Sequence, residues 1–184
     1  MILPTTYLGP VEWYRRFLSP IAQRPILDTR YPIIEVMESF PKQTYRNRCT
    51  ITTPDGPLTL SIPVKRADSK QLTRDVEISY QQRWQHQHWI ALMSAYKRTP
   101  YFDYYADFFR PFYEKETKFL VDFNEELHEV IHQLIRNSEF KIQNSKFTTD
   151  WSGLDLEPCF GDGQSILDLL FEYGPETAII IQNS

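Results

Sequence analysis

The hexapeptide WQHQHW, residues 84–89, places two histidines two positions apart between two tryptophans. On a β-strand, His86 and His88 would point to the same side and could share a metal ion. On a helix they point about 200° apart, and the continuation WIALMSAYK has a helical pattern. We therefore predict no metal site here. His88 is expected on the inward helix face with Trp84, either as a buried structural histidine or as a general base with a pKa near neutrality.

A second group of possible metal ligands lies in ELHEVIHQ, residues 126–133 with Glu125 just before it. The pairs Glu125–His128 and Glu129–His132 have the Glu-x-x-His spacing of carboxylate-bridged metal bundles. At about 100° per residue, these four side chains fall opposite the apolar arc of the same helix. We expect them to form a solvent-facing surface and not a metal site.

The segment TYRNRC, residues 44–49, is the basic cluster of the chain. Arg46 and Arg48 flank Asn47, and two guanidinium groups around an amide suit the binding of a phosphate or a carboxylate. The alternative is a salt-bridged strand end. Cys49 is expected to be a small core residue, because no Cys-His-Asn arrangement is close in the sequence. We find no glycine-rich phosphate loop and no serine nucleophile elbow.

Length and composition limit the class of protein. The 184 residues suit a single domain over residues 1–184. The net charge of −4 argues against a nucleic-acid partner or an anionic membrane surface. No apolar run approaches the roughly 18 residues of a membrane span, and two cysteines without a secretory leader favour a cytoplasmic protein. The oligomeric state is left open.

The clearest local pattern is a β-hairpin over residues 48–64. The runs CTITT and LTLSIPV flank Pro54-Asp55-Gly56, a turn sequence that fixes one φ and then allows a left-handed residue. Further strands are expected at 2–8, 32–37 and 75–80. Helices are expected at 11–18, 84–98, from 100 onward with an interruption at Pro111, 118–135, 165–171 and 176–181.

This order of elements predicts an α+β fold. A mixed or antiparallel sheet from the N-terminal half, including the hairpin at 48–64, would be covered by the C-terminal helices. The first strand, turn and helix leave a three-layer α/β fold with a Rossmann-like sheet as the alternative.

Six blocks of the chain, taken together, resemble the WbqC-like protein family of bacteria in its short form. They are TTYLGPVEWY (5–14), FPKQTYRNRCTI (40–51), LSIPV (60–64), DVEISYQQRWQHQHWIALMSAYKRTPYFDYY (75–105), PFYEKETKFLVDFNEEL (111–127) and QSILDLLFEYGPE (164–176). Longer members of this family lie among genes for lipopolysaccharide O-antigen and other surface polysaccharides. The site candidates carried over by the resemblance are Tyr7, Arg46, Asn47, Arg48, Trp84, His88, Tyr96, Tyr101 and Asp168.

The resemblance implies an enzyme of surface polysaccharide or O-antigen biosynthesis, a group transferase that uses an activated donor. Arg46 and Arg48 would hold an anionic group of a nucleotide-sugar or acyl donor, and Asn47 would orient it. His88 would be the general base, and Tyr7 and Asp168 would contact the substrate. The apolar and stacking walls would come from Trp84, Tyr96 and Tyr101. The alternative is a non-catalytic module that binds a sugar nucleotide or a partner protein. No cofactor is predicted.

The chain departs from the longer relatives at two places. They begin with His-Gln-Pro, where this chain has Pro4-Thr5-Thr6, and they carry an extra segment before the final Leu-Asp-Leu-Leu type of block. We therefore carry over no role from that first histidine or from that segment.

Overall fold

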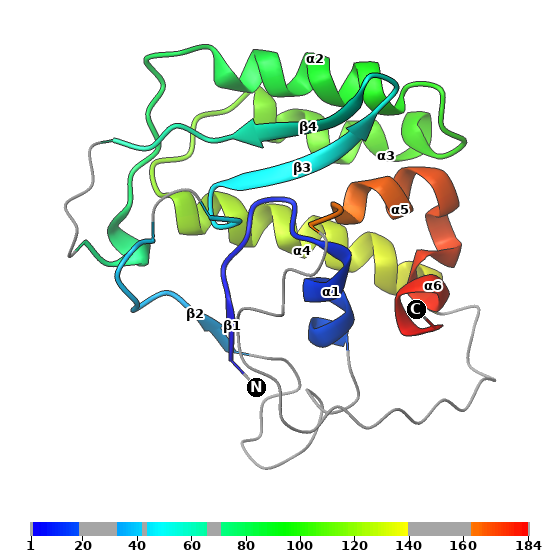
Figure 1. The fold of residues 1–184 in the computed structure, drawn as a ribbon, viewed down its shortest axis with the longest axis horizontal. Helices are drawn as coiled ribbons and strands as arrows, with labels where there is room; N and C mark the ends of the chain where they lie inside the picture. The colour runs from blue at the N-terminus through cyan, green and yellow to red at the C-terminus, as the bar shows by residue number, and fades with distance from the viewer. Residues whose placement is uncertain (1, 19–32, 42–43, 66–70, 140–162, 184) are drawn as a thin grey trace.

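The computed structural model describes residues 2–18, 33–41, 44–65, 71–139 and 163–183 (Figure 1). The four strands are β1 (Ile2–Pro4), β2 (Ile33–Glu35), β3 (Arg48–Thr53) and β4 (Gly56–Ser61). The helices are α1 (Val11–Leu18), α2 (Trp84–Tyr96), α3 (Phe102–Phe109), α4 (Leu120–Glu139), α5 (Ile166–Tyr173) and α6 (Thr177–Asn183). This combination confirms the α+β prediction.

The described strands form two separate two-stranded sheets. Strands β1 and β2 pair in parallel, with Leu3 opposite Ile34. Helix α1 follows β1 in the chain, as a strand–helix–strand unit requires. Within the described residues this unit stops at two strands, so the Rossmann-like sheet of the alternative prediction is not formed.

The predicted hairpin is present as β3 and β4. Its register places Cys49 opposite Leu60 and Thr53 opposite Gly56. Gly56 has φ of 115°, which explains why glycine stands after Pro54-Asp55. The alternation of Cys49 and Ile51 with threonines buries one face, because successive side chains of a strand point to opposite sides.

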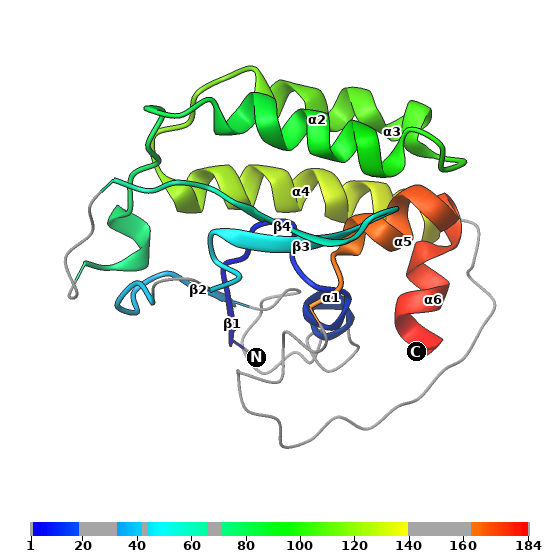
Figure 2. The same cartoon turned by 45° about the horizontal axis from the view of Figure 1, so that its top comes forward.

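The helices form layers around the hairpin. In Figure 2, α2 and α3 lie above α4, and α1 lies on the other side of the hairpin. Helix α2 contacts β3, while α6 contacts both α1 and α4. The core joins all of these layers, with fully buried rings from Trp13, Trp84, Phe109, Phe123 and Phe171. Helix α5 contacts β3 and helix α6 contacts α4, so the last two helices pack against the hairpin and α4.

Two expectations are wrong in detail. Residues 75–80 are not a strand: a 3-10 helix occupies Thr73–Asp75, and the following residues make only isolated bridges. The histidines of α4 do not face solvent. His128 packs against Phe17 with ring centroids 4.4 Å apart, and His132 against the same ring at 5.2 Å. Helix α1 covers this flank of α4, which the helical wheel of α4 alone cannot reveal.

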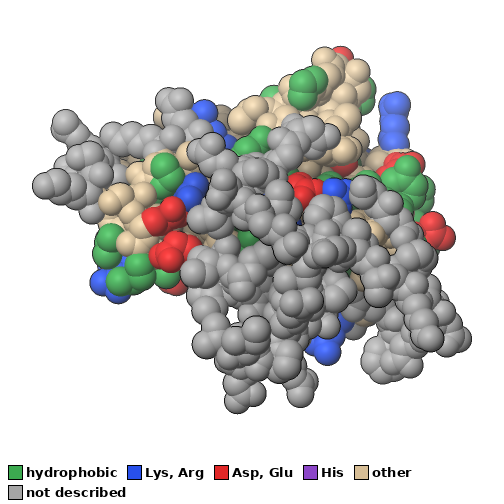
Figure 3. Space-filling view, turned by 60° about the horizontal axis from the view of Figure 1, so that its bottom comes forward, with side chains coloured by type: hydrophobic (Ala, Val, Ile, Leu, Met, Phe, Trp, Pro, Cys, Tyr) green, Lys and Arg blue, Asp and Glu red, His purple; other side chains and the backbone are tan. Residues whose placement is uncertain are grey.

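On the face shown in Figure 3, acidic and basic side chains of the described residues both appear, in some places side by side. Among the described residues, no helix combines the length and the apolar character needed to cross a bilayer.

Candidate functional site

The predicted arginine block lies where three segments of the chain meet. The carbonyl oxygen of Tyr45 accepts hydrogen bonds from the Tyr7 amide at 2.9 Å and from the Thr6 hydroxyl at 3.1 Å. The Tyr45 hydroxyl lies against Gly163, where an added Cβ would come within 2.1 Å of it. Gly163 also has φ of 80°, so both space and backbone conformation favour glycine. The loop after β1, the turn before β3 and the entry to α5 are thus held together.

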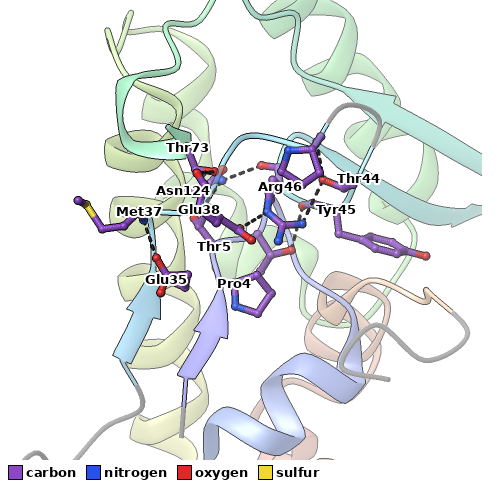
Figure 4. Close-up of polar contacts among 12 residues, drawn as sticks. Pro4, Thr5, Glu35, Met37, Glu38, Thr44, Tyr45, Arg46, Thr73 and Asn124 are labelled. Atoms are coloured by element: carbon purple, nitrogen blue, oxygen red, sulfur yellow. Dashed lines mark hydrogen bonds and ion pairs between the residues drawn. The ribbon is translucent and has the colours of Figure 1, made fainter. Parts of the chain in front are cut away.

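Arg46 is neutralised inside this junction. Its Nε donates to Oε1 of Glu38 at 2.5 Å, and its Nη1 lies 3.4 Å from the Thr44 hydroxyl (Figure 4). Asn124 of α4 donates to the Arg46 carbonyl at 2.8 Å and to the Thr5 hydroxyl at 3.3 Å. The cluster lies just beyond the carboxyl ends of β1 and β2. Arg46 is only 9% exposed, so its charge is committed to Glu38.

Asn47 closes the mouth of the hairpin. Its Nδ2 donates to the Ile62 carbonyl at 2.9 Å, and the Ile62 amide donates back to the Asn47 carbonyl at 2.8 Å. These two bonds extend the β3–β4 pairing by one step. The side-chain oxygen Oδ1 is buried and has no hydrogen-bond partner among the described residues.

Arg48 differs from Arg46 in having no counter-charge among the residues that the structure describes. It is the first residue of β3 and lies opposite Ser61 of β4. By strand alternation its side chain shares a face with Thr50 and Thr59, whose hydroxyls are 3.5 Å apart. Within the described part of the chain, the Arg48 guanidinium makes no ion pair, and its buried Nε has no hydrogen-bond partner. This face of the hairpin therefore presents one uncommitted cation beside several hydroxyls.

His88 is at the centre of a buried polar cluster on the other side of the hairpin. The Tyr7 hydroxyl lies 2.9 Å from His88 Nδ1 and 3.0 Å from the Tyr113 hydroxyl. Burial lowers the pKa of His88 to about 4, and a backbone hydrogen bond to Ser61 offsets part of that shift. The imidazole is thus neutral at pH 7. The hydrogen bond to the Ser61 backbone raises the pKa of His88, as a bond to a carbonyl does, so we assign the ring proton to Nε2 and the acceptor role toward Tyr7 to Nδ1.

Trp84 forms one wall of this cluster, as its place one turn before His88 predicts. Its ring lies edge-on to His88, with centroids 5.1 Å apart, and edge-on to Phe123 at 5.7 Å. Both Trp84 and His88 are buried, which confirms the predicted inward face of α2. His86 is exposed on the opposite side of the same helix. The Trp84 Nε1 has no partner among the described residues.

Asp168 and Tyr96 form a second polar pair, at the other end of the hairpin. The Tyr96 hydroxyl donates to Asp168 Oδ1 at 2.8 Å. The amide and the hydroxyl of Thr52 donate to the same carboxylate at 3.1 and 3.2 Å. Burial raises the pKa of Asp168, and these bonds counteract the shift. Ser165 caps α5, because its hydroxyl accepts a hydrogen bond from the Leu167 amide, whereas the side chain of Asp168 reaches across to Thr52 of β3.

Cys49 lies between these two polar clusters. Burial raises the pKa of its thiol, and the nearby carboxylate of Asp168 raises it further. A thiol with a raised pKa is protonated at pH 7 and is a poor nucleophile. Its buried position on β3 confirms the prediction of a small core residue.

Tyr101 stands apart from the other candidates. Its ring stacks on Tyr105, with centroids 6.1 Å apart and planes at 17°. It also lies against Gly174, where an added Cβ would come within 2.4 Å of the ring. Its amide donates to the Phe171 carbonyl at 3.1 Å. These contacts tie the start of α3 to the end of α5 and include none of the other predicted site residues.

The structure therefore divides the predicted set. Tyr7, Trp84 and His88 come together, Tyr96 pairs with Asp168, and the three residues of the arginine block have three different environments. Sequence reasoning missed the partners Glu38, Thr52, Tyr113 and Asn124. Of these, Asn124 could have been noticed in the sequence, because it is an amide next to the apolar arc of α4. In the structure it is only 1% exposed, and a buried amide needs hydrogen-bond partners.

A comparison with protein families identifies a relationship that covers more than half of the chain. The sequence model of the WbqC-like protein family matches residues 33–150. That range contains the arginine block, Trp84, His88, Tyr96 and Tyr101, whereas Tyr7 and Asp168 lie outside it. No curated protein and no solved structure matches the chain.

Proposed function

Because this chain belongs to the WbqC-like protein family, we propose that it is a group transferase of bacterial surface polysaccharide biosynthesis. In this proposal Arg48 binds the anionic group of an activated donor on the hydroxyl-bearing face of the hairpin. The single observation that carries it is the contrast between two arginines two positions apart. Arg46 is paired with Glu38, whereas Arg48 has no counter-charge among the described residues.

The chemistry of Arg48 favours an anion as its partner. A buried donor without an acceptor costs about 1–3 kcal/mol, and more when it carries charge. A phosphate or carboxylate oxygen would remove that cost and add charge-assisted hydrogen bonds. The neighbouring hydroxyls of Thr50, Thr59 and Ser61 can donate to the same anion or accept from sugar hydroxyls.

The length of the strand fits an extended donor. Arg48 and Thr52 are four residues apart on β3, which is about 13 Å along a strand. Asp168 is bonded to Thr52 at the far end. A carboxylate has about four acceptor positions. In Asp168, hydrogen bonds from Tyr96 and Thr52 occupy three of them. One position remains for a substrate hydroxyl, so a donor held by its phosphate at Arg48 would place its sugar near Asp168.

His88 stays the predicted general base in one form of this proposal. Its Nδ1 is occupied by the Tyr7 hydroxyl, and His88 itself is only 5% exposed. A substrate proton could reach His88 only through Tyr7, which is itself buried and lies with His88 on the side of the hairpin away from Arg48. The same burial and the pKa of about 4 favour the second candidate function, a non-catalytic module that binds a sugar nucleotide.

A ligand screen tests the proposal. We expect UDP-glucose or acetyl-CoA to raise the melting temperature of the wild-type protein, and Arg48→Ala to abolish this shift. Arg110→Ala is the matched control, since Arg110 is exposed and paired with Glu114. An undiminished shift in Arg48→Ala would refute the role of Arg48. Stabilisation without turnover would identify the binding module, and His88→Ala with unchanged turnover and affinity would remove the base role.

A further inference from the structure

The backbone of β4 points alternately toward β3 and away from it, as in any antiparallel pair. The Ile62 amide donates to the Asn47 carbonyl at 2.8 Å, and the Ile62 carbonyl accepts from the Asn47 side chain at 2.9 Å. Ile62 therefore points toward the β3 side of the hairpin. Because the register of β3 and β4 is continuous, the amides and carbonyls of Pro57, Thr59 and Ser61 point away from β3.

The outer edge of β3 is covered by the entry to α5. The Thr50 carbonyl accepts from the Ser165 amide at 3.2 Å, and the Thr52 amide donates to Asp168 at 3.1 Å. These are the β3 positions that the same alternation turns outward. At these positions the backbone groups are therefore paired within the chain.

The outer edge of β4 has no such cover among the described residues. Within them, neither the Thr59 amide and carbonyl nor the Ser61 amide makes a hydrogen bond. Leu58 lies between them and is 41% exposed. The edge closes again only at Pro63, whose carbonyl accepts from the Ser79 amide at 2.8 Å. Unpaired backbone groups on an exposed edge are a template for another strand.

The free groups of this edge fit a second copy of the same edge. If two β4 strands pair antiparallel with Thr59 at the two-fold axis, each Thr59 amide faces the Thr59 carbonyl of the partner subunit. Each Ser61 amide then faces the free carbonyl of the partner subunit's Pro57. Proline has no amide to give in return, and the Ser61 carbonyl needs none, because it bonds to His88. This register leaves no outward amide of the edge without an acceptor.

Side chains agree with the same register. Leu58 would lie across from Leu60 of the partner subunit, as a non-hydrogen-bonded pair whose side chains are close. The pairing would thus cover an exposed apolar side chain. None of residues 57–61 is charged, so no like charges oppose each other across the edge.

We propose that the open edge of β4 pairs with β4 of a second copy of this chain, so that two hairpins form one antiparallel sheet. Helix α2 packs over β3 and leaves this edge to the partner. The faces that carry Thr50 and Thr59 would then continue from one subunit into the other. The pairing does not depend on the proposed transferase activity.

Analytical ultracentrifugation of the purified full chain measures this association. We expect a reversible monomer–dimer equilibrium, and Thr59→Pro should weaken it at least about tenfold, because the bonds at the two-fold axis are lost. The hairpin itself should tolerate this proline, since the Thr59 amide lies outside the β3–β4 ladder. Ile90→Lys, a change of an exposed apolar residue on α2, is the control and should leave the dimer intact. A monomer at every concentration, or an equally stable dimer in Thr59→Pro, would overturn the proposal.

Hydrogen exchange of the wild-type chain locates the contact without a variant. The amides of Thr59 and Ser61 should exchange more slowly as the protein concentration rises. The Leu60 amide, which points toward β3, should exchange at a constant rate. Rates at Thr59 and Ser61 that do not depend on concentration would contradict the pairing.

A disulfide tests the register. Residues of a hydrogen-bonded antiparallel pair have Cα atoms about 5.5 Å apart, which is within the range that a disulfide spans. In a Cys159→Ser background, Thr59→Cys should therefore form a covalent dimer on mild oxidation. Asp55→Cys is the control, because Asp55 is equally exposed but lies at the turn, far from the proposed axis. Equal cross-linking of both variants would exclude this register.

Discussion

The hydroxyl of Tyr7 lies 2.9 Å from Nδ1 of His88, although 81 positions separate the two residues in the chain. This bond joins the loop after β1 to helix α2. Tyr113 extends it with a second hydroxyl at 3.0 Å. Since all three side chains are buried, the bonds hold without competition from water, and we expect them to contribute to stability.

Removal of the Tyr7 hydroxyl tests this contribution. Tyr7→Phe should lower the free energy of unfolding by about 1–3 kcal/mol, because it leaves the buried acceptor of His88 without a donor. The measurement is urea unfolding of Tyr7→Phe, His88→Ala and the double variant. We expect the double variant to lose less than the sum of the two single losses. Strict additivity would show that the two groups do not interact.

Stability should fall as the pH is lowered from neutrality. The pKa of His88 is about 4 in the folded protein and about 6.5 in an unfolded chain. Between these values the unfolded chain binds more protons, so unfolding becomes easier as pH falls, by up to about 3 kcal/mol for this group. Burial also lowers the pKa of His128, to about 3, and this adds to the same trend.

Thermal unfolding between pH 7 and pH 4.5 measures this trend. His88→Gln should reduce the slope of stability against pH, while His86→Gln should not, because His86 is exposed. A slope that is identical in wild type and His88→Gln would mean that His88 is not buried as a neutral imidazole.

The carboxylate of Asp168 should anchor α5 to the edge of β3. Asp168→Ala removes the acceptor for Tyr96 and for two donors of Thr52, and we expect a loss of about 2–3 kcal/mol. Tyr96→Phe should lose about 1 kcal/mol. Glu172→Ala on the same helix is the control, since Glu172 is exposed. Hydrogen exchange of the α5 amides should quicken in Asp168→Ala, and unchanged exchange would exclude the anchoring role.

The ion pair of Arg46 should matter more than an exposed pair of the same type. Glu38→Ala leaves the buried Arg46 guanidinium without its acceptor, with an expected loss of about 1–3 kcal/mol. Glu114→Ala, which breaks the exposed pair with Arg110, should cost less than Glu38→Ala, because water and salt screen an exposed ion pair. Chemical unfolding of both variants gives the comparison. Equal losses would show that Arg46 is solvated in solution.

Local patterns were sufficient to predict the hairpin and most helices. The turn Pro54-Asp55-Gly56 and the alternation around Cys49 specify β3 and β4, because both depend on neighbouring residues only. Helical phase likewise placed Trp84 and His88 inward on α2. The strand expected at 75–80 is not formed. Its residues pair only at single positions, Ile78 with Val64 and Glu77 with Phe119, and such isolated bridges do not make a continuous ladder.

The site was less predictable because its contacts join distant segments. The neighbouring sequence does not distinguish Arg46 from Arg48. The two differ because Glu38, in the segment after β2, lies against Arg46 in the folded chain. Similarly, a helical wheel of α4 identifies the one apolar face that packs on the core. It cannot show that α1 packs against a second face and contacts His128 through Phe17. The pairing of Arg46 and the burial of His128 therefore depend on tertiary contacts and not on residue type.

The affinity of UDP-glucose for Arg48 variants, measured by isothermal titration calorimetry at two salt concentrations, tests the proposed role of Arg48 most directly. We predict that Arg48→Ala and Arg48→Lys both weaken binding, with alanine at least about tenfold weaker and with less salt dependence than wild type. Arg110→Ala should bind like wild type. Wild-type affinity and an unchanged salt dependence in Arg48→Ala would contradict the claim that Arg48 holds the anionic group of the donor.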